Sequence, residues 1–404
     1  MSRAVLLLLM ALPAGAQPVY DLLIKNGHVI DPASGRDGRT DVAVTGGTIV
    51  RVARDLSGSQ AKKVVDATGY YVMPGLIDIH THLDTFGPPL SLNADHQNLR
   101  NCVCTAVDAG TTGWKTFERF KKQVADPSRV RVLALLNIVG SGMYGPKVED
   151  NVEDMDPEAT AKMVKKHPDI LVGIKTAHFS LLTWDAIDRA TKAAELSNTI
   201  LMVDFWPKPG REFRDILKRM RPGDLYTHTY GSPVILLDEN KRVHHYVWEA
   251  RRRGVLFDVG HGAGSFWFRI AAPATGQGFW PDTISTDIHK NSIMLPQATM
   301  PMTMSKFLNL GMPLNQAVEK STIAPARSLH LNGLGTLREG AVADIAVMKL
   351  DRGTFAYLDS GRGKLTGNQR LRCALTVRAG KVVWDNDGLF AEEWKNAGPY
   401  SNFK

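Results

Sequence analysis

Three shortages in this 404-residue sequence limit the class of protein. It has only three cysteines, Cys102, Cys104 and Cys373, which are too few for the disulfide framework of a small secreted domain. Two of them lie two positions apart and the third is remote, so we expect all three to be free thiols. Beyond residue 17, no apolar run is long enough to cross a bilayer. We therefore expect neither a disulfide scaffold nor a membrane partner.

The sequence also lacks a concentrated basic region, although its net charge is +8. The tight basic clusters are Lys62-Lys63, Lys165-Lys166 and residues 251–253, and each precedes an apolar run. That arrangement is typical of solvated helix ends or loops, so we expect no nucleic-acid partner. A hydrophobic content of 44% and a charged content of 22% are those of a globular protein.

The first residues have the pattern of an export signal. Arg3 is followed by apolar residues 4–12, Pro13 and the small residues 14–16, which favours cleavage after Ala16. The alternative is a ragged apolar start to a cytoplasmic protein. We expect residues 1–16 to be a signal peptide and the mature protein to be soluble and exported, either periplasmic or secreted.

Residues 74–332 repeat one unit, a short β-rich apolar run followed by a longer amphipathic stretch. The eight runs are 75–82, 111–117, 131–139, 171–177, 200–205, 225–230, 255–262 and 283–289. Helical patterns between them include 183–194 and 243–253. This alternation predicts an α/β fold in which eight parallel βαβ units close a TIM-type (β/α)₈ barrel.

The two flanks of this region favour a different structure. Short β-rich runs broken by turn residues occupy residues 17–73, and similar runs follow in 333–404, with a hairpin turn at Ala379-Gly380. We expect these segments to form one small composite β-sandwich from both chain ends.

Ionisable side chains gather at the carboxyl ends of the eight runs, where the active sites of such barrels are built. They are His80 and His82, Lys175, Asp204, His228, His261, Asp287 and His289. Because side chains two apart on a strand share a face, His80 and His82 point the same way and can hold one metal ion. The concentration of histidines at these ends predicts a metal site rather than a polar loop.

Lys175 lies inside the apolar run 171–177. Burial favours the neutral amine, and a neutral amine can add carbon dioxide to give a carboxylate-like carbamate. That head group can bridge two metal ions. The alternative is a lysine that reaches solvent or pairs with Asp204.

These segments resemble the amidohydrolase superfamily of metal-dependent hydrolases. The likeness rests on the segment 74–82, PGLIDIHTH, on Lys175, and on the terminal segments 343–347 and 378–383. The segments 172–178, 257–262 and 284–289 are similar to the dihydroorotase-like deacetylase branch.

The resemblance implies a set of ligands. His80, His82 and Asp287 would hold one ion, Lys175 would bridge both ions as N6-carboxylysine, and His228 would hold the second. Run five ends in Asp204 where the superfamily has a histidine, so Asp204 or His178 could supply the missing ligand, or the second metal could be weak or absent. One or two divalent ions are expected, zinc first, with manganese, iron or cobalt open.

The implied reaction is hydrolysis of an amide, N-acyl, cyclic amide or ester bond of a small molecule, deacetylase-like, by a metal-activated hydroxide. Asp287 would be the acid/base, and His261 or His289 would stabilise the oxyanion or contact substrate, or else hydrogen-bond the ligands. His261 is favoured because Gly260 and Gly262 allow close backbone approach. Deamination, decarboxylation or isomerisation on the same fold, or a catalytically inactive binding protein, are the alternatives. Whether the protein is a homo-oligomer is left open.

Overall fold

The computed structural model describes residues 19–399. The signal peptide predicted at 1–16 lies outside the described residues. None of the described helices is long and apolar enough to cross a membrane.

Seven parallel strands form a curled sheet in the order β14-β13-β12-β11-β10-β9-β8. Their bounds are β8 Leu76–Thr81, β9 Val103–Gly113, β10 Arg131–Asn137, β11 Leu171–Ala177, β12 Ile200–Asp204, β13 Leu225–Tyr226 and β14 Leu256–Phe257. The predicted α/β barrel architecture is confirmed, but the second strand begins earlier than the run 111–117 that we predicted. The segment 103–110 contains Asp108, whose carboxylate is buried and accepts from the backbone N–H groups of Leu83 and Thr111.

The eighth run closes the ring without forming a continuous strand. Thr283 bridges Asp258 beside β14, and Ile288 bridges Thr81 of β8, both in parallel sense. Asp287 has a φ of 47°, a left-handed conformation that an extended strand cannot contain. The eighth predicted strand is therefore a bridging segment, and the ends of the runs still meet at one mouth.

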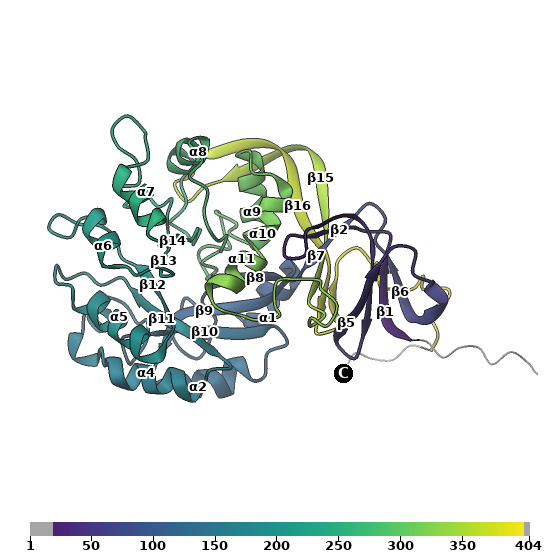
Figure 1. Cartoon of the computed structure of the whole chain (residues 1–404), viewed down its shortest axis with the longest axis horizontal. Coiled ribbons are helices and arrows are strands. Elements are labelled where there is room, and N and C mark those ends of the chain that lie inside the picture. Colours follow the sequence, from purple (N-terminus) through teal and green to yellow (C-terminus); the bar gives the residue numbers. More distant parts are fainter. Residues whose placement is uncertain (1–18, 400–404) are drawn as a thin grey trace, which may run out of the picture.

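Helices cover the outside of the curled sheet, except for α11, which packs against its inner core (Figure 1). Their bounds are α1 Ala94–Asn98, α2 Phe117–Phe120, α3 Pro146–Glu149, α4 Pro157–Lys166, α5 Asp185–Ser197, α6 Phe213–Arg219, α7 His245–Arg252, α8 Phe268–Gly276, α9 Met300–Asn309, α10 Leu314–Glu319 and α11 Ile323–Ser328. In α5, Ala186, Ile187, Ala190, Ala193 and Ala194 are buried, at the spacing of a helix with one apolar face. Three-residue 3₁₀ turns lie at Gly58–Gln60, Leu99–Asn101 and Val152–Asp154, and a π-helical turn at Lys121–Ala125.

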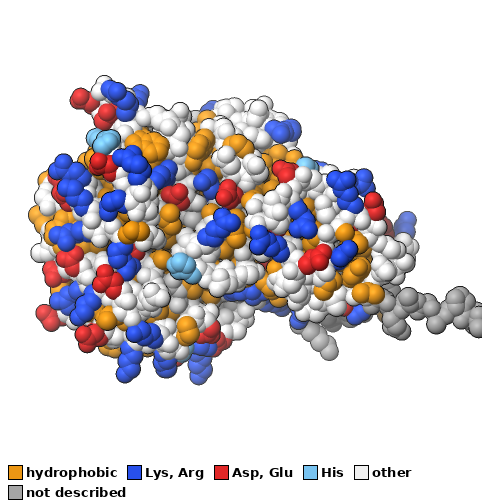
Figure 2. Space-filling view, in the orientation of Figure 1, with side chains coloured by type: hydrophobic (Ala, Val, Ile, Leu, Met, Phe, Trp, Pro, Cys, Tyr) orange, Lys and Arg blue, Asp and Glu red, His pale blue; other side chains and the backbone are white. Residues whose placement is uncertain are grey.

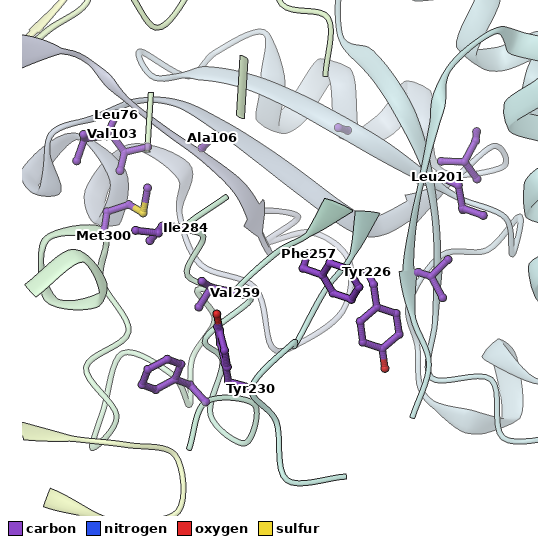
Figure 3. Close-up of a cluster of buried hydrophobic side chains, with 14 of the residues drawn as sticks. Leu76, Val103, Ala106, Leu201, Tyr226, Tyr230, Phe257, Val259, Ile284 and Met300 are labelled. Atoms are coloured by element: carbon purple, nitrogen blue, oxygen red, sulfur yellow. The ribbon is translucent and has the colours of Figure 1, made fainter. Parts of the chain in front are cut away.

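Two apolar cores hold the barrel together. An inner core contains Ile79, Val107, Leu135 and Met202 from the strands, with Ala326 of α11 packed against them. An outer core lies between the sheet and the helices, and Figure 3 draws part of it, including Tyr226, Phe257 and Met300. Both cores fix the strands, so the side chains at the strand ends are held by rigid elements.

The β-sandwich is built from both chain ends. One sheet has the order β5-β4-β1-β6 and the other β17-β16-β15-β7-β2-β3. The strands are β1 Tyr20–Lys25, β2 His28–Asp31, β3 Arg36–Arg39, β4 Asp41–Thr45, β5 Thr48–Ala53, β6 Ala61–Asp66, β7 Tyr71–Pro74, β15 Ile345–Leu358, β16 Lys364–Arg378 and β17 Lys381–Asp385. A third core joins Ile24 and Val44 to Ile345 and Val377, so neither end can form this core alone.

Strands β15 and β16 extend beyond the sandwich as a long antiparallel hairpin. In Figure 1 this hairpin, in yellow-green to yellow, arches from the sandwich to α8 at the barrel. Its tip, residues 359–363, contacts the segment that follows β14, since Ser360 donates its backbone N–H to Phe266 O at 2.8 Å. The carboxyl-terminal part of the chain therefore reaches the mouth of the barrel.

The prediction of three free thiols is wrong for two of them. Cys102, just before β9, and Cys373 of β16 form a disulfide with a Cα–Cα distance of 5.5 Å, while Cys104 is a buried free thiol. The bond joins residues 271 positions apart and ties the barrel to the sandwich. Spacing along the chain could not reveal this pair, because the two cysteines come together only when β16 packs beside β9.

On the face drawn in Figure 2, Lys and Arg side chains are dispersed among acidic and uncharged ones. This dispersal agrees with the sequence pattern, in which the basic clusters are short and separated.

Candidate metal centre

The first group of candidate ligands consists of His80, His82 and Asp287. Their ligand atoms lie within 4.8 Å of one another, and all three residues are buried. Asp287 Oδ1 is 3.0 Å from His82 Nε2 and 3.7 Å from His80 Nε2. The alternation of strand β8 aims both rings into the mouth, as the His-x-His spacing predicted.

The second group shares His80 and adds Asp204 and His228. His228 Nε2 lies 3.3 Å from Asp204 Oδ2. The amine of Lys175 contacts two members of this second group, 3.0 Å from His80 Nε2 and 3.2 Å from Asp204 Oδ2. Lys175 is fully buried, and the absence of a side chain at Gly110 makes room for it, because a Cβ there would lie 2.7 Å from Lys175 Cγ.

Contacts outside the groups orient the rings. His80 Nδ1 is 2.9 Å from Thr227 Oγ1, and that hydroxyl donates to Asp258 Oδ2 at 2.8 Å. His228 donates its Nδ1–H to Gly260 O at 2.6 Å. With Nδ1 engaged, the rings of His80 and His228 present Nε2 to the site, which is how histidine ligands are usually held.

Burial and neighbouring charges set the protonation states. Burial, and then the positive charge of Lys175, lower the pKa of His80 to about 4, so the ring is neutral near pH 7. Burial alone would raise the pKa of Asp287, but His80 and His82 outweigh it and hold that pKa below its usual range. Neutral imidazole and ionised carboxylate are the forms that bind metal ions.

Three of the predicted site residues have strained backbones. His178, His228 and Asp287 have φ values of 53°, 60° and 47°, in the left-handed region that residues with side chains rarely adopt. Such conformations concentrate at functional sites because the surrounding structure must hold them.

The remaining predicted residues lie around these groups. His178 Nε2 is 3.8 Å from Asp204 Oδ2 and its Nδ1 is 2.8 Å from the buried Glu149, so it stands at the rim with half its side chain exposed. His289 Nε2 is 3.9 Å from Asp287 Oδ2. Of the two candidates for the run-five position, Asp204 belongs to a candidate group and His178 does not.

His261 is the one predicted residue whose ring nitrogens are not directed at these groups. Its Nδ1–H donates to Gly262 O at 3.0 Å, and its Nε2 accepts from Lys306 at 2.7 Å. Its ring stacks on Phe266 at 4.7 Å between centroids. The catalytic role of His261 stays a prediction, and both of its ring nitrogens already have partners.

Sequence reasoning missed Lys306, Asp258 and Thr227. Lys306 has the same signal that identified Lys175, a lone lysine in the otherwise apolar and small-polar stretch 300–308. Thr227 directly precedes His228 in run six, and Asp258 lies two residues before Gly260 in run seven. Nothing in the sequence distinguishes either of them from an ordinary strand residue.

Comparison with known proteins gives a consistent result. Residues 63–180 and 269–383 each match a profile described as amidohydrolase family. A deacetylase of Enterococcus faecalis is 30% identical over 379 residues, covering 91% of this chain and all of that protein. A deacetylase of Agrobacterium fabrum is 29% identical over 80% of this chain and 81% of its own length. A crystal structure of an adenine deaminase has a TM-score of 0.82 at 28% identity, covering 91% of this chain and 100% of that one.

Proposed function

Because the chain belongs to the amidohydrolase superfamily, we propose that it is a metal-dependent hydrolase that removes an acyl group from a small molecule. The bond cleaved would be an amide, N-acyl, cyclic amide or ester bond. One observation carries the proposal. Two buried His/Asp groups share His80, and the buried amine of Lys175 contacts this shared histidine and Asp204.

The donor atoms fit one or two divalent ions. Asp204 Oδ1 is buried without a hydrogen-bond partner, and an unpaired carboxylate oxygen among histidines is stabilised by a cation. His80, His82 and Asp287 would hold one ion, and His228 and Asp204 the other. Zinc is the metal we propose, with manganese, iron or cobalt as the alternatives. Such ions, when bound, lower the pKa of a bound water toward neutrality and polarise a carbonyl group.

Lys175 is the proposed bridging ligand. Once it has lost its proton, its amine would attack carbon dioxide, forming an N–C bond and releasing one more proton, and the product would be a carbamate with a single negative charge. The amine is 3.0 Å from His80 Nε2, which belongs to both groups, and 3.2 Å from Asp204 Oδ2, so the added head group would lie beside these candidate ligands.

Asp287 is the proposed acid/base. Its Oδ1 lies 3.0 Å from His82 Nε2, and its Oδ2 lies 3.9 Å from His289 Nε2, so the carboxylate is held at the mouth with one oxygen toward each ring. It would take a proton from water and deliver it to the leaving nitrogen or oxygen. The His289 ring, partly exposed beside it, is the proposed substrate contact.

The space beside this centre suits a small molecule. A cavity of about 260 Å³ is lined by His178, Phe179, Trp206, Lys208 and Arg211. We propose a small-molecule substrate, with neither a nucleic acid nor a membrane as partner. We also propose that the protein is exported, because the disulfide between Cys102 and Cys373 would persist in an oxidising compartment.

Hydrolytic deamination is the second candidate, supported by the similarity to the adenine deaminase structure. The two reactions differ in the bond that is broken. Acyl-group hydrolysis breaks an acyl carbon–nitrogen or carbon–oxygen bond, whereas deamination breaks a bond between a ring carbon and an amine nitrogen. Decarboxylation, isomerisation and an inactive binding protein are further outcomes that the same assay would reveal.

The test is a substrate screen on metal-loaded protein that begins after Ala16. N-acyl amino acids, acylated hydroxy acids and cyclic amides form one arm, and adenine and related aminopurines form the other. Release of carboxylic acid in the first arm, abolished in the Asp287→Asn variant, supports the proposal. Ammonia release in the second arm alone would replace it with deamination, and failure to retain any divalent ion would overturn it.

A further inference from the structure

The backbone of the turn at residues 260–262 lies directly against the candidate metal centre. Gly260 O accepts the Nδ1–H of His228 at 2.6 Å. A Cβ at Gly260 would lie 2.3 Å from Thr227 Oγ1, and one at Gly262 would lie 2.3 Å from Asp287 Oδ2. The glycines have φ values of 45° and 54°. Because no side chain separates this turn from the ligand candidates, a shift of the turn would move them directly.

His261, between the two glycines, points into the protein and is held there by Lys306. Lys306 lies on α9, is fully buried, and donates to His261 Nε2 at 2.7 Å and to Pro296 O at 2.8 Å. Because Nε2 accepts this bond, the ring carries its proton on Nδ1 and can donate to Gly262 O. The ring also stacks on Phe266.

Lys306 donates to His261 from a buried position, which is unfavourable for an amine. Neither of its two hydrogen bonds goes to a carboxylate, and the acidic group whose charge acts on it is Asp359 at the hairpin tip. Burial lowers the pKa of Lys306 to about 7. A buried amine without a carboxylate partner is costly, and a methionine of similar length would fill the space without that cost. The contact with His261 is therefore the specific property that the lysine adds.

The tip of the β15–β16 hairpin holds the same turn from another side. Ser360 Oγ donates to Gly262 O at 3.2 Å, and Asp359 Oδ2 accepts from Phe268 N at 2.9 Å. The arch of this hairpin toward α8 is visible in Figure 1. The turn is thus held by α9 through His261 and by the hairpin through Ser360.

We propose that Lys306 is a positioning residue for the metal centre, acting through His261 on the 260–262 turn and so on His228 and Asp287, with Ser360 as a second, weaker support. This inference rests on the proposed function, because it assumes that His228 and Asp287 bind metal. It assigns His261 a part in holding the turn, and it gives the hairpin from the β-sandwich a part in the centre.

The experiment compares Lys306→Met, which removes the donor at similar volume, with Lys320→Met as the matched control. Lys320 is another lysine whose pKa is lowered by burial, and it lies at the end of α10. Metal-free proteins are titrated with zinc, and bound metal is measured after equilibration at a series of buffered free-zinc concentrations. We expect Lys306→Met to weaken binding of the most weakly held zinc by about 10- to 100-fold, the usual effect of losing a group that orients a ligand. The Lys320→Met protein should bind zinc as the wild type does.

Kinetics and a second variant complete the test. With a substrate from the screen, kcat should fall at saturating zinc while KM changes by less than about threefold, because the substrate contacts are not altered. Ser360→Ala should weaken zinc binding in the same direction by a smaller factor, and it decides the matter if Lys306→Met does not fold. Wild-type zinc binding and kcat in both variants would overturn the positioning role while leaving the proposed function intact. Wild-type protein that binds no zinc would instead overturn the proposed function itself.

Discussion

Removal of the Cys102–Cys373 disulfide should destabilise the protein strongly without lowering its activity. The bond closes a loop between residues 271 positions apart, so the unfolded chain loses much conformational entropy when it is present. The chain-entropy relation gives a stabilisation of about 5–6 kcal/mol for a loop of this length, and residual structure in the unfolded state reduces the measured value to about 3–5 kcal/mol. Cys102 precedes β9, at the end of the strand opposite the mouth, so the metal centre should be unaffected.

The assay is urea unfolding of wild-type, Cys373→Ala and Cys104→Ala proteins, with the wild type measured with and without a thiol reductant. Cys104 is buried close to β16, its Sγ 3.3 Å from Val377 O, but it forms no disulfide, so its variant reports the cost of losing a buried thiol in the same region. Cys373→Ala, and the wild type with reductant, should unfold at a urea concentration lower by about 1 M or more. The reasoning is refuted if Cys373→Ala is as stable as Cys104→Ala, or if the wild type with its disulfide intact gains nothing over the reduced form.

Four further outcomes follow from the candidate metal centre and its surroundings. His80→Ala should lose bound metal and nearly all hydrolysis, since His80 belongs to both groups, while its circular dichroism stays that of the wild type; metal analysis showing full occupancy would contradict the assignment. Asp287→Asn should lower kcat by about two to four orders of magnitude, the range of a general base, while it retains more metal than His80→Ala; an unchanged rate would move proton transfer to another group. Lys175→Ala should be inactive and partly restored by short carboxylic acids, and a crystal structure showing a bare amine away from loaded metals would dismiss the carbamate. Lys306→Met should change the pH dependence of stability. Because the pKa of Lys306 is about 7 in the folded protein, the unfolded chain binds more protons than the folded one between about pH 7 and 10. The stability of the wild type therefore rises with pH in this range, by up to about 1.4 kcal/mol per pH unit, and the variant should lack that rise.

The barrel and most of its mouth could be predicted because they are encoded locally. Each strand needs a short apolar run, and parallel strands place their carboxyl ends at one face, so His80, Asp204 and His228 could be brought together from the sequence alone. The second strand was misplaced because Asp108 reads as a polar interruption, whereas the fold buries its carboxylate against backbone N–H groups. A buried acid of this kind can be recognised only when its donors are known.

The parts that could not be predicted depend on contacts between distant segments. Cys102 and Cys373 meet through the packing of the sandwich on the barrel, and no local pattern records that packing. Lys306 is a lone lysine in a mostly apolar stretch, but only the position of α9 against the 260–262 turn shows that its amine contacts His261. Strands β15 and β16 continue through residues 351–358 and 364–372, where glycines and charged residues interrupt the apolar pattern by which a strand is recognised.

The left-handed backbone at His178, His228 and Asp287 means that stability and function favour different residues at the mouth of the barrel. Each of these positions would be relaxed by glycine, which adopts such angles without the steric penalty of about 1 kcal/mol that other residues meet. Selection for thermal resistance alone would therefore favour variants in which the imidazole of His228 or the carboxylate of Asp287 has disappeared. At these three positions a side chain is present at the cost of a strained backbone. A library of variants screened only for heat tolerance should therefore lose the side chains of these residues first.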